Sequence, residues 1–271
     1  MNPYIHLTQP LIFDSHAHYQ FDAFDRDRDE LLSNLKKDGV CGAVICGSTL
    51  ENSRAAVALA EKYPNLYAAA GVHPGDVNEA GHFAEFRNEL ESLLKSPKVV
   101  ALGEIGLDYH YDGTNRELQA EWLGGQLELA AALKLPVLIH DRDAHADTLA
   151  VLKEFKPRGV VHCFSGSPEM AEEVTRLGMY IGLGGSVTFK NAKTQPEVAK
   201  RVPIERLLLE TDAPYLAPAP FRGKRCDSRH IAITAAKIAE VRGEDVEYIL
   251  RVTRENARGL FNLTSDFKFL I

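Results

Sequence analysis

Short apolar segments alternate with amphipathic segments along nearly the whole chain. Most of the apolar segments have no polar position inside them, which is typical of parallel strands covered on both faces. We predict eight strands: Leu11–Asp14, Val40–Cys46, Leu66–Val72, Val99–Gly103, Val137–Ile139, Gly159–Val161, Tyr180–Leu183 and Leu207–Leu209. The segments between them carry apolar residues at helical spacing and predict helices at about Asp25–Asp38, Leu50–Lys62, His82–Lys95, Arg116–Leu133, Ala144–Phe155, Glu169–Leu177 and Pro196–Arg201.

Eight strand–helix units in one chain predict an α/β fold of the closed (β/α)8 TIM-barrel type, although open doubly wound sheets share the pattern. The segment Arg229–Asn262 predicts two or three further helices that cover one end of the barrel. The length of 271 residues suits a single barrel, and no linker interrupts the pattern. We therefore expect one domain over residues 1–271, with its core at about 11–263.

The net charge of -7 means that the surface as a whole does not attract phosphates, so contact with nucleic acid would need a local basic patch or a bound cation. The four cysteines form no C-x-x-C pair, and the segment Met1–Pro10 lacks the apolar core of a signal peptide. Reduced thiols in a cytoplasmic protein are therefore expected. No apolar run approaches the length that spans a membrane, so we expect no membrane partner.

Ionisable side chains stand at the ends of five predicted strands, namely His16, His18, Glu104, His140, His162 and Asp212. The carboxyl ends of the strands form the active-site face of such barrels, so these side chains would converge on one mouth. Each has a simpler alternative: His140 as a core histidine, Glu104 as a helix-capping acid, Asp212 as a turn residue. Burying so many ionisable groups without a metal is costly. The pattern therefore predicts a metal-dependent hydrolase with a two-metal site, in which Glu104 is the bridging carboxylate.

Competing chemistries lack support in the sequence. The glycine-rich segments at 124–125 and 182–185 do not match a Walker or a dinucleotide-binding fingerprint. Cys163 directly follows His162 and is expected to be a packed thiol rather than a nucleophile.

Seven motifs follow one another along the chain: DSHAH at 14–18, GVHP at 71–74, GEIGLDY at 103–109, LPVLIHDR at 135–142, HCFSG at 162–166, TFKNA at 188–192 and ETDAPYL at 210–216. In this order they resemble the TatD family of metal-dependent deoxyribonucleases, within the amidohydrolase-like barrels. The resemblance covers about residues 11–263, nearly the whole chain.

The resemblance implies a ligand set in which His16, His18 and Asp212 hold one metal, Glu104 is shared, and His140 and His162 complete the second. It implies a 3′→5′ exodeoxyribonuclease that favours single strands and needs two divalent ions, Mg²⁺ or Mn²⁺ for activity. Zn²⁺, Co²⁺ or Ni²⁺ can occupy such ligands in the purified protein. The ions would activate a water for attack on phosphorus, and Glu104 and Asp212 would be the catalytic carboxylates. The 3′ end of single-stranded DNA is then the expected substrate, with no obligate protein partner.

Four residues are candidates for substrate contacts: His73, Arg142, Arg222 and Arg225. His73 can also be a structural histidine before a proline, and Arg142 can instead pair with Asp141 or Asp143. The basic loop at 222–225, which includes Lys224, can be a solvated charge run. Tyr109 and Tyr215 are candidates for stacking on a base or for packing.

One segment departs from the family pattern. After the basic loop the family usually reads Asn-Glu-Pro, whereas this chain reads Cys226-Asp227-Ser228. The departure leaves room for hydrolysis of another ester or amide, by a phosphomonoesterase, a tRNA deacylase or a small-molecule amidohydrolase. A metal-binding scaffold without activity is a third alternative. The sequence assigns no role to the tail Thr264–Ile271.

Overall fold

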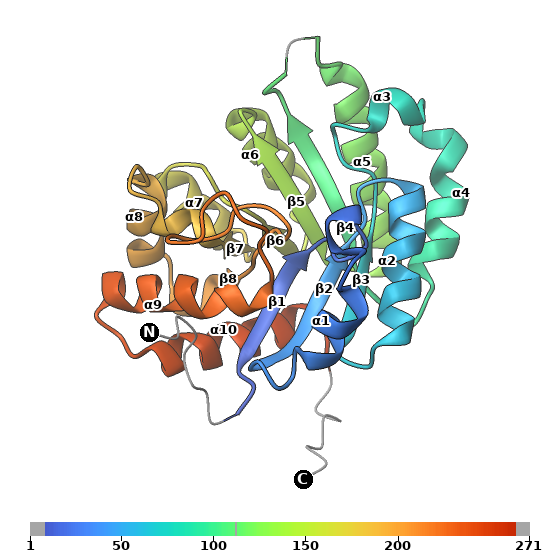
Figure 1. Ribbon diagram of the computed structural model, residues 1–271. Coiled ribbons are helices and arrows are strands. Elements are labelled where there is room, and N and C mark those ends of the chain that lie inside the picture. The colour runs from blue at the N-terminus through green and yellow to red at the C-terminus, as the bar shows by residue number, and fades with distance from the viewer. Residues whose placement is uncertain (1–8, 112, 264–271) are drawn as a thin grey trace.

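Eight parallel strands, hydrogen-bonded in chain order, form the centre of the computed structural model, which describes residues 9–111 and 113–263 (Figure 1). The strands are β1 (Ile12–Ala17), β2 (Val40–Cys46), β3 (Leu66–Ala70), β4 (Val99–Asp108), β5 (Val137–Arg142), β6 (Gly159–Val161), β7 (Tyr180–Leu183) and β8 (Leu207–Leu209). Residues 1–8 of the N-terminal segment and the tail Thr264–Ile271 lie outside the described residues.

The sheet closes on itself through the segment that follows β8. The Asp212 amide donates to the carbonyl of His16 at 2.9 Å, and the His18 amide donates to the carbonyl of Ala213 at 2.7 Å. These bonds join the last strand to the first and form a nearly closed barrel. The predicted (β/α)8 TIM barrel is therefore confirmed.

Helices surround the barrel on its outside (Figure 1). Those between strands are α1 (Arg28–Asn34), α2 (Leu50–Lys62), α3 (Val77–Ala80), α4 (Phe83–Leu94), α5 (Arg116–Leu133), α6 (His145–Phe155), α7 (Pro168–Arg176) and α8 (Thr194–Arg201). Single turns of 3-10 helix lie at Asp22–Phe24, Gly185–Thr188, Ile204–Arg206 and Ser228–His230. The two tail helices, α9 (Ile231–Arg242) and α10 (Val246–Leu260), pack against β1 and β8 and so cover the seam of the barrel.

Apolar side chains fill the barrel interior on the side of the amino ends of the strands, and polar side chains lie at the carboxyl ends. Alternate strand residues such as Val44, Leu138 and Leu208 form an interior cluster with Phe13 and Phe261. The rings of Phe13 and Phe261, the latter just after α10, stack at a centroid distance of 6.2 Å. Because these apolar side chains close the amino end, the barrel is open to ligands at the carboxyl ends of its strands, which we call the mouth.

Two irregular strands turn their polar residues toward this mouth. Register shifts occur in β1 between Asp14 and Ala17 and in β4 between Leu102 and Ile105. Such irregularities change which side of the sheet a residue faces and are common beside active sites. They allow the histidines of β1 and Glu104 of β4 to face the same interior as the side chains of the regular strands.

Several predicted strand ends were wrong. β1 continues to Ala17 rather than Asp14, β4 to Asp108 rather than Gly103, and β5 to Arg142 rather than Ile139. The apolar runs end where the polar side chains begin, but the backbone continues to pair with its neighbours, as at Gly106 and His140. Gly106 is required there because a Cβ on it would collide with the carbonyl of His140.

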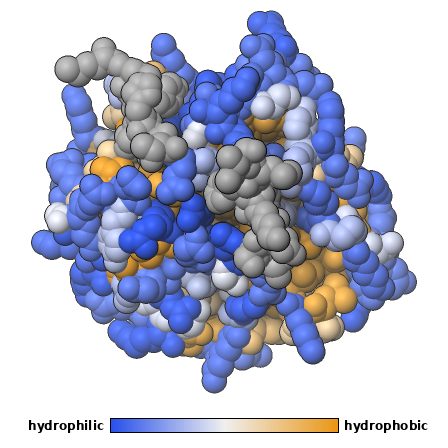
Figure 2. Space-filling model, turned by 90° about the horizontal axis from the view of Figure 1, so that it is seen from below, coloured by the Kyte–Doolittle hydropathy of each residue, from blue (hydrophilic) through white to orange (hydrophobic). Residues whose placement is uncertain are grey.

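No helix in the described part of the chain is long and apolar enough to cross a membrane. Figure 2 shows the molecule from below, on the side where β1 begins in Figure 1, and this face is predominantly hydrophilic with separate hydrophobic patches.

Candidate metal centre

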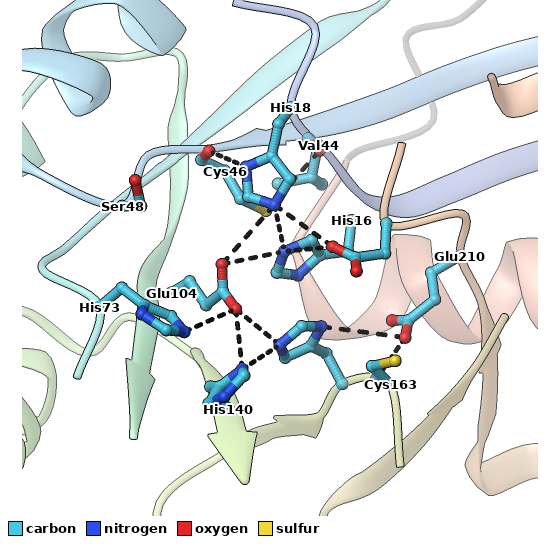
Figure 3. A network of polar contacts seen from close by, with 12 residues as sticks. His16, His18, Val44, Cys46, Ser48, His73, Glu104, His140, Cys163 and Glu210 are labelled. Atoms are coloured by element: carbon cyan, nitrogen blue, oxygen red, sulfur yellow. Dashed lines mark hydrogen bonds and ion pairs between the residues drawn. The ribbon is translucent and has the colours of Figure 1, made fainter. Parts of the chain in front are cut away.

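The carboxylate of Glu104 lies between two pairs of histidines (Figure 3). Its Oε2 is 3.4 Å from Nε2 of His16 and 3.6 Å from Nε2 of His18. Its Oε1 is 2.9 Å from Nε2 of His162 and 3.0 Å from Nδ1 of His140. One buried carboxylate therefore presents one oxygen to each pair of imidazoles, which is the arrangement of a bridging ligand.

Asp212 completes the pair formed by the β1 histidines. Its Oδ1 lies 3.4 Å from Nε2 of His18 and 3.9 Å from Nε2 of His16. Its backbone has a left-handed φ of 58°, which is uncommon for a non-glycine residue and occurs often at active sites. The hydrogen bond from the Asp212 amide to the carbonyl of His16 holds Asp212 in this position. The structure thus brings together all six residues that the sequence analysis predicted as ligands.

Hydrogen bonds on the outer side of two rings fix which nitrogen faces the centre. Nδ1 of His18 donates to the carbonyl of Cys46 at 2.7 Å, so its Nε2 presents a lone pair. Nε2 of His140 donates to Asp108 at 3.2 Å, which leaves Nδ1 for the centre. Partners of this kind orient metal-binding histidines.

The donor set fits a pair of divalent cations. Nε2 of His16 and Nε2 of His18 are 3.2 Å apart, and Nδ1 of His140 and Nε2 of His162 are 3.3 Å apart. At such distances a shared proton or a cation must lie between the two ring nitrogens of each pair, and a divalent ion can replace the proton. Imidazoles with carboxylates suit ions such as Zn²⁺ and Mn²⁺.

The electrostatics of the centre are set by the same contacts. Burial would raise the pKa of the Glu104 carboxyl, but His162, His73 and His16 around it hold that pKa well below its usual range. Burial would lower the pKa of His140, but its hydrogen bonds to Asp108 and Glu104 raise it to about 9. In the metal-free protein, therefore, protonated His140 supplies the positive charge that a bound cation would otherwise supply.

His73 also reaches this centre, but the structure makes it a hydrogen-bond donor. Its Nδ1 accepts from the Gly75 amide at 2.9 Å, so the neutral ring carries its hydrogen on Nε2. That nitrogen lies 3.5 Å from Oε1 of Glu104. Burial lowers the pKa of His73 to about 4, so the ring is neutral at pH 7.

Two glutamines of α5 hold the segments that carry His73 and Asp108. Gln126 accepts from the amide of Val72 at 2.8 Å and donates to its carbonyl at 3.1 Å. Gln119 pairs in the same way with the amide and carbonyl of Asp108, at 2.9 Å and 3.0 Å. Both side chains are buried. The sequence analysis missed them, although two glutamines seven residues apart on the apolar side of a helix were a usable signal.

Asp14 lies behind the ligands and joins the two edges of the barrel. It accepts hydrogen bonds from the amides of His16 and Thr211, at 3.2 Å and 3.1 Å, and from the Thr211 hydroxyl at 2.6 Å. Burial raises the pKa of its carboxyl to about 6. Asp14 is therefore a support for His16 and Asp212 and does not face the centre.

Glu210 supports the β6 side of the centre. It is fully buried, accepts from the Cys163 amide, and has one oxygen 4.0 Å from Nδ1 of His162. A Cβ at Gly182 would collide with this carboxylate, so the glycine makes room for it. Burial raises the pKa of the Cys163 thiol well above its usual range, which fits the packed thiol that we predicted.

The predicted substrate-binding arginines differ in their surroundings. Arg142 makes no ion pair with any described residue, because Asp141 bonds to His145 and Asp143 bonds to His110. Its guanidinium instead lies 5.4 Å from the centre of the Tyr111 ring.

Within the basic loop, Arg222 lies 4.3 Å over the ring of Phe189. Arg225 makes two hydrogen bonds of 2.6 Å to the carboxylate of Asp27, so its charge is already paired. The roles of these arginines as substrate contacts stay predictions.

Of the two tyrosines, Tyr109 is held in place. Its hydroxyl donates to Asp147 at 2.9 Å and Arg116 covers its ring at 4.0 Å, which favours the packing role. Tyr215 is 55% exposed.

Comparison with known proteins agrees with the geometry. The family model described as TatD related DNase matches residues 13–262. A metal-dependent hydrolase of Bacillus subtilis, YabD, described as uncharacterized, is 40% identical over 256 residues, 93% of this chain and 100% of that protein. A protein of Citrobacter koseri named 3′-5′ ssDNA/RNA exonuclease TatD is 35% identical over 260 residues, 93% of this chain and 99% of that protein. The crystal structure of YJJV, a TatD homolog from Escherichia coli, superposes with a TM-score of 0.88 at 35% identity, over 94% of this chain and 99% of that chain.

Proposed function

Because the chain belongs to the family of TatD-related DNases and is a metal-dependent hydrolase, we propose that it cleaves phosphodiester bonds at the 3′ end of single-stranded DNA. One observation supports the proposal most directly. The carboxylate of Glu104 directs one oxygen toward His16 and His18 and the other toward His140 and His162.

The centre would hold one divalent ion at His16, His18 and Asp212 and a second at His140 and His162, with Glu104 between them. When bound, two such ions activate water and stabilise the charge that develops on a phosphate. The residues of the chain add orientation. Glu104 would set the spacing between the two ions. Asp212, with 19% of its side chain exposed, would accept a proton from the attacking water.

Two cationic or donating groups belong to the same end of the barrel: His73 lies beside Glu104, and Arg142 ends β5, two residues after His140. His73 offers an N–H on its Nε2, and Arg142 offers a guanidinium without a carboxylate partner among the described residues. Donors placed where negative charge develops lower the barrier of a reaction. We assign both to the non-bridging oxygens of the substrate phosphate.

The choice of nucleic acid rests on the relatives. The Citrobacter koseri protein is named for 3′-5′ exonuclease activity on single-stranded DNA and RNA, whereas the Bacillus subtilis protein carries no substrate in its name. Single-stranded 3′ ends are therefore the first substrates to test. We also place the protein in the cytoplasm, where its four free thiols would stay reduced.

The test is digestion of a 5′-labelled single-stranded oligonucleotide with Mg²⁺ or Mn²⁺ and with a chelator. We expect a ladder that shortens from the 3′ end, loss of activity with chelator, and recovery on adding metal. Glu104→Ala should abolish the ladder, and Glu128→Ala, which removes an exposed glutamate of α5, should keep it. A ladder that is unaffected by chelator or by Glu104→Ala would rule out the assigned centre.

A panel of small substrates separates the alternatives with the same centre. Bis(p-nitrophenyl) phosphate, p-nitrophenyl phosphate, an acylated tRNA and a simple amide represent the diesterase, monoesterase, deacylase and amidohydrolase. Hydrolysis of the diester together with the oligonucleotide supports the proposal. Preference for one of the other three would replace it, while the metal centre would stand.

A further inference from the structure

An open groove of about 720 Å³ adjoins the rim of the metal centre. One wall is the segment 214–217, which starts two residues after Asp212, and another is the basic loop 222–225. In Figure 1 both belong to the orange loop above α9. Phe189 lines the groove as well.

Aromatic rings lead from a predicted ligand to this groove. The ring of Phe21 stacks on the ring of His18, with centroids 4.8 Å apart and planes 8° from parallel. The ring of Tyr215 lies 6.4 Å from Phe21. A strand whose phosphate lies at the metal centre would therefore pass Tyr215 within a few nucleotides.

The groove combines flat surfaces with positive charge. Tyr215 is 55% exposed, unusual for a large aromatic side chain. The Arg222 guanidinium carbon lies over the Phe189 ring, 4.3 Å from its centre. Arg222 and Lys224 form no ion pair with a described residue, so their charges remain available to an anion. Aromatic faces and arginines that alternate with cationic side chains are the chemistry of single-strand binding.

Hydrogen bonds hold the loop in shape without a ligand. Arg225 pairs with Asp27 and also donates to the carbonyl of Ala23 at 2.8 Å. The Cys226 amide donates to the carbonyl of Pro214 at 2.9 Å, which ties the two walls together. A preformed surface loses less conformational freedom on binding.

We propose that this groove is a base-binding subsite: it holds one base of a single nucleic-acid strand, within three nucleotides of the bond that is cleaved. The base stacks on Tyr215 and the Arg222 guanidinium, and Lys224 faces the adjoining phosphate. The inference rests on the proposed function for the position of the strand, and it adds a subsite that acts on binding and not on the chemical step.

The test measures binding to the metal-loaded protein without hydrolysis. The probe is a fluorescein-labelled oligothymidylate with phosphorothioate linkages, which resist cleavage. In three versions, one of the last three bases at the 3′ end is removed to leave an abasic residue. Fluorescence anisotropy then gives the Kd of each version for the wild type, Tyr215→Ala, Arg222→Ala and Arg251→Ala. The last is a matched control, because it removes a guanidinium that lies 5.4 Å from the Tyr248 ring on α10.

We expect one abasic position to weaken binding to the wild type and to Arg251→Ala by about 5- to 100-fold, the range for one stacked base. At that position the penalty should disappear in Tyr215→Ala and fall in Arg222→Ala. The same penalty in Tyr215→Ala as in the wild type, or no penalty at any position, would overturn the subsite. Because nothing is cleaved, failure of the subsite is separate from failure of the exonuclease assay.

Discussion

The hydroxyl of Ser228 donates to Oδ2 of Asp14 at 2.7 Å, although the two residues lie near opposite ends of the chain. Both are buried, and the hydroxyl of Tyr19 lies 2.7 Å from Ser228 on its other side. Asp14 in turn holds the amides of His16 and Thr211. The departure from the family pattern at 226–228 therefore changes a residue that holds Asp14 behind the predicted metal ligands. It changes none of the predicted ligands themselves.

Ser228→Ala should lower the free energy of unfolding by about 1–3 kcal/mol, because it leaves a buried carboxylate oxygen with one donor fewer. The measurement is chemical unfolding of the metal-free protein. Ser92→Ala, at an exposed serine of α4, should change stability by less than about 0.5 kcal/mol. Equal stability of the two variants would mean that the Ser228 bond contributes nothing.

Glu104→Gln should reduce bound metal from two ions to one or none per chain. The neutral amide keeps the shape but removes the charge that both histidine pairs face. Metal content after gel filtration, measured by mass spectrometry, checks the number. Glu128→Gln is the control, and a full complement of two ions in Glu104→Gln would show that Glu104 is not shared.

Metal affinity should rise with pH through the neutral range. The pKa of His140 is raised to about 9, so below that pH a proton competes with the cation for Nδ1, and the apparent affinity should increase about tenfold per pH unit. The folding stability of the metal-free protein should change in the opposite direction and fall as the pH rises. The stabilising contribution of protonated His140 is complete below about pH 6.5 and is lost as the pH rises through 9.

The variant Asp108→Asn tests the cause of that shift. It weakens a bond that raises the pKa of His140, so the midpoint of the affinity-against-pH curve should move to lower pH. Titration with a competing chromogenic chelator between pH 6 and 10 gives both curves. An unchanged midpoint would exclude Asp108 as the source of the raised pKa.

His73→Ala should lower kcat by about 10- to 1000-fold and leave the metal content unchanged, because the ring donates a hydrogen bond and is not a ligand. His140→Ala should lower both. Activity on bis(p-nitrophenyl) phosphate, together with metal analysis, separates the two roles. Loss of metal from His73→Ala would make it a ligand and contradict the tautomer that Gly75 imposes.

The sequence predicted the barrel and the convergence of its ligands because both depend on local patterns. Continuous apolar runs marked the strands, and β2, α2 and α5 have the predicted bounds. His16, Glu104, His140 and Asp212 each follow such a run, and in a barrel the runs end at one mouth.

What the sequence could not give depends on contacts between distant residues. No local pattern shows that Ser228 reaches Asp14, that Gln119 pairs with the backbone of Asp108, or that Asp27 neutralises Arg225. The register shifts in β1 and β4 were also invisible, because they follow from the fit between neighbouring strands. The ends of β1, β4 and β5 were placed too early for the same reason, whereas the end of β3 was placed too late, at Val72 instead of Ala70.

The seam between the first and last strands has a consequence for synthesis of the protein. During translation His16 and His18 leave the ribosome early. The Asp212 amide that holds His16, the Ala213 carbonyl that holds His18 and the Ser228 hydroxyl arrive only when most of the chain has been made. An incomplete chain therefore carries these two imidazoles without the Asp212 carboxylate that faces both of them. We therefore expect no hydrolysis by the nascent polypeptide before the segment after the eighth strand has joined the first strand.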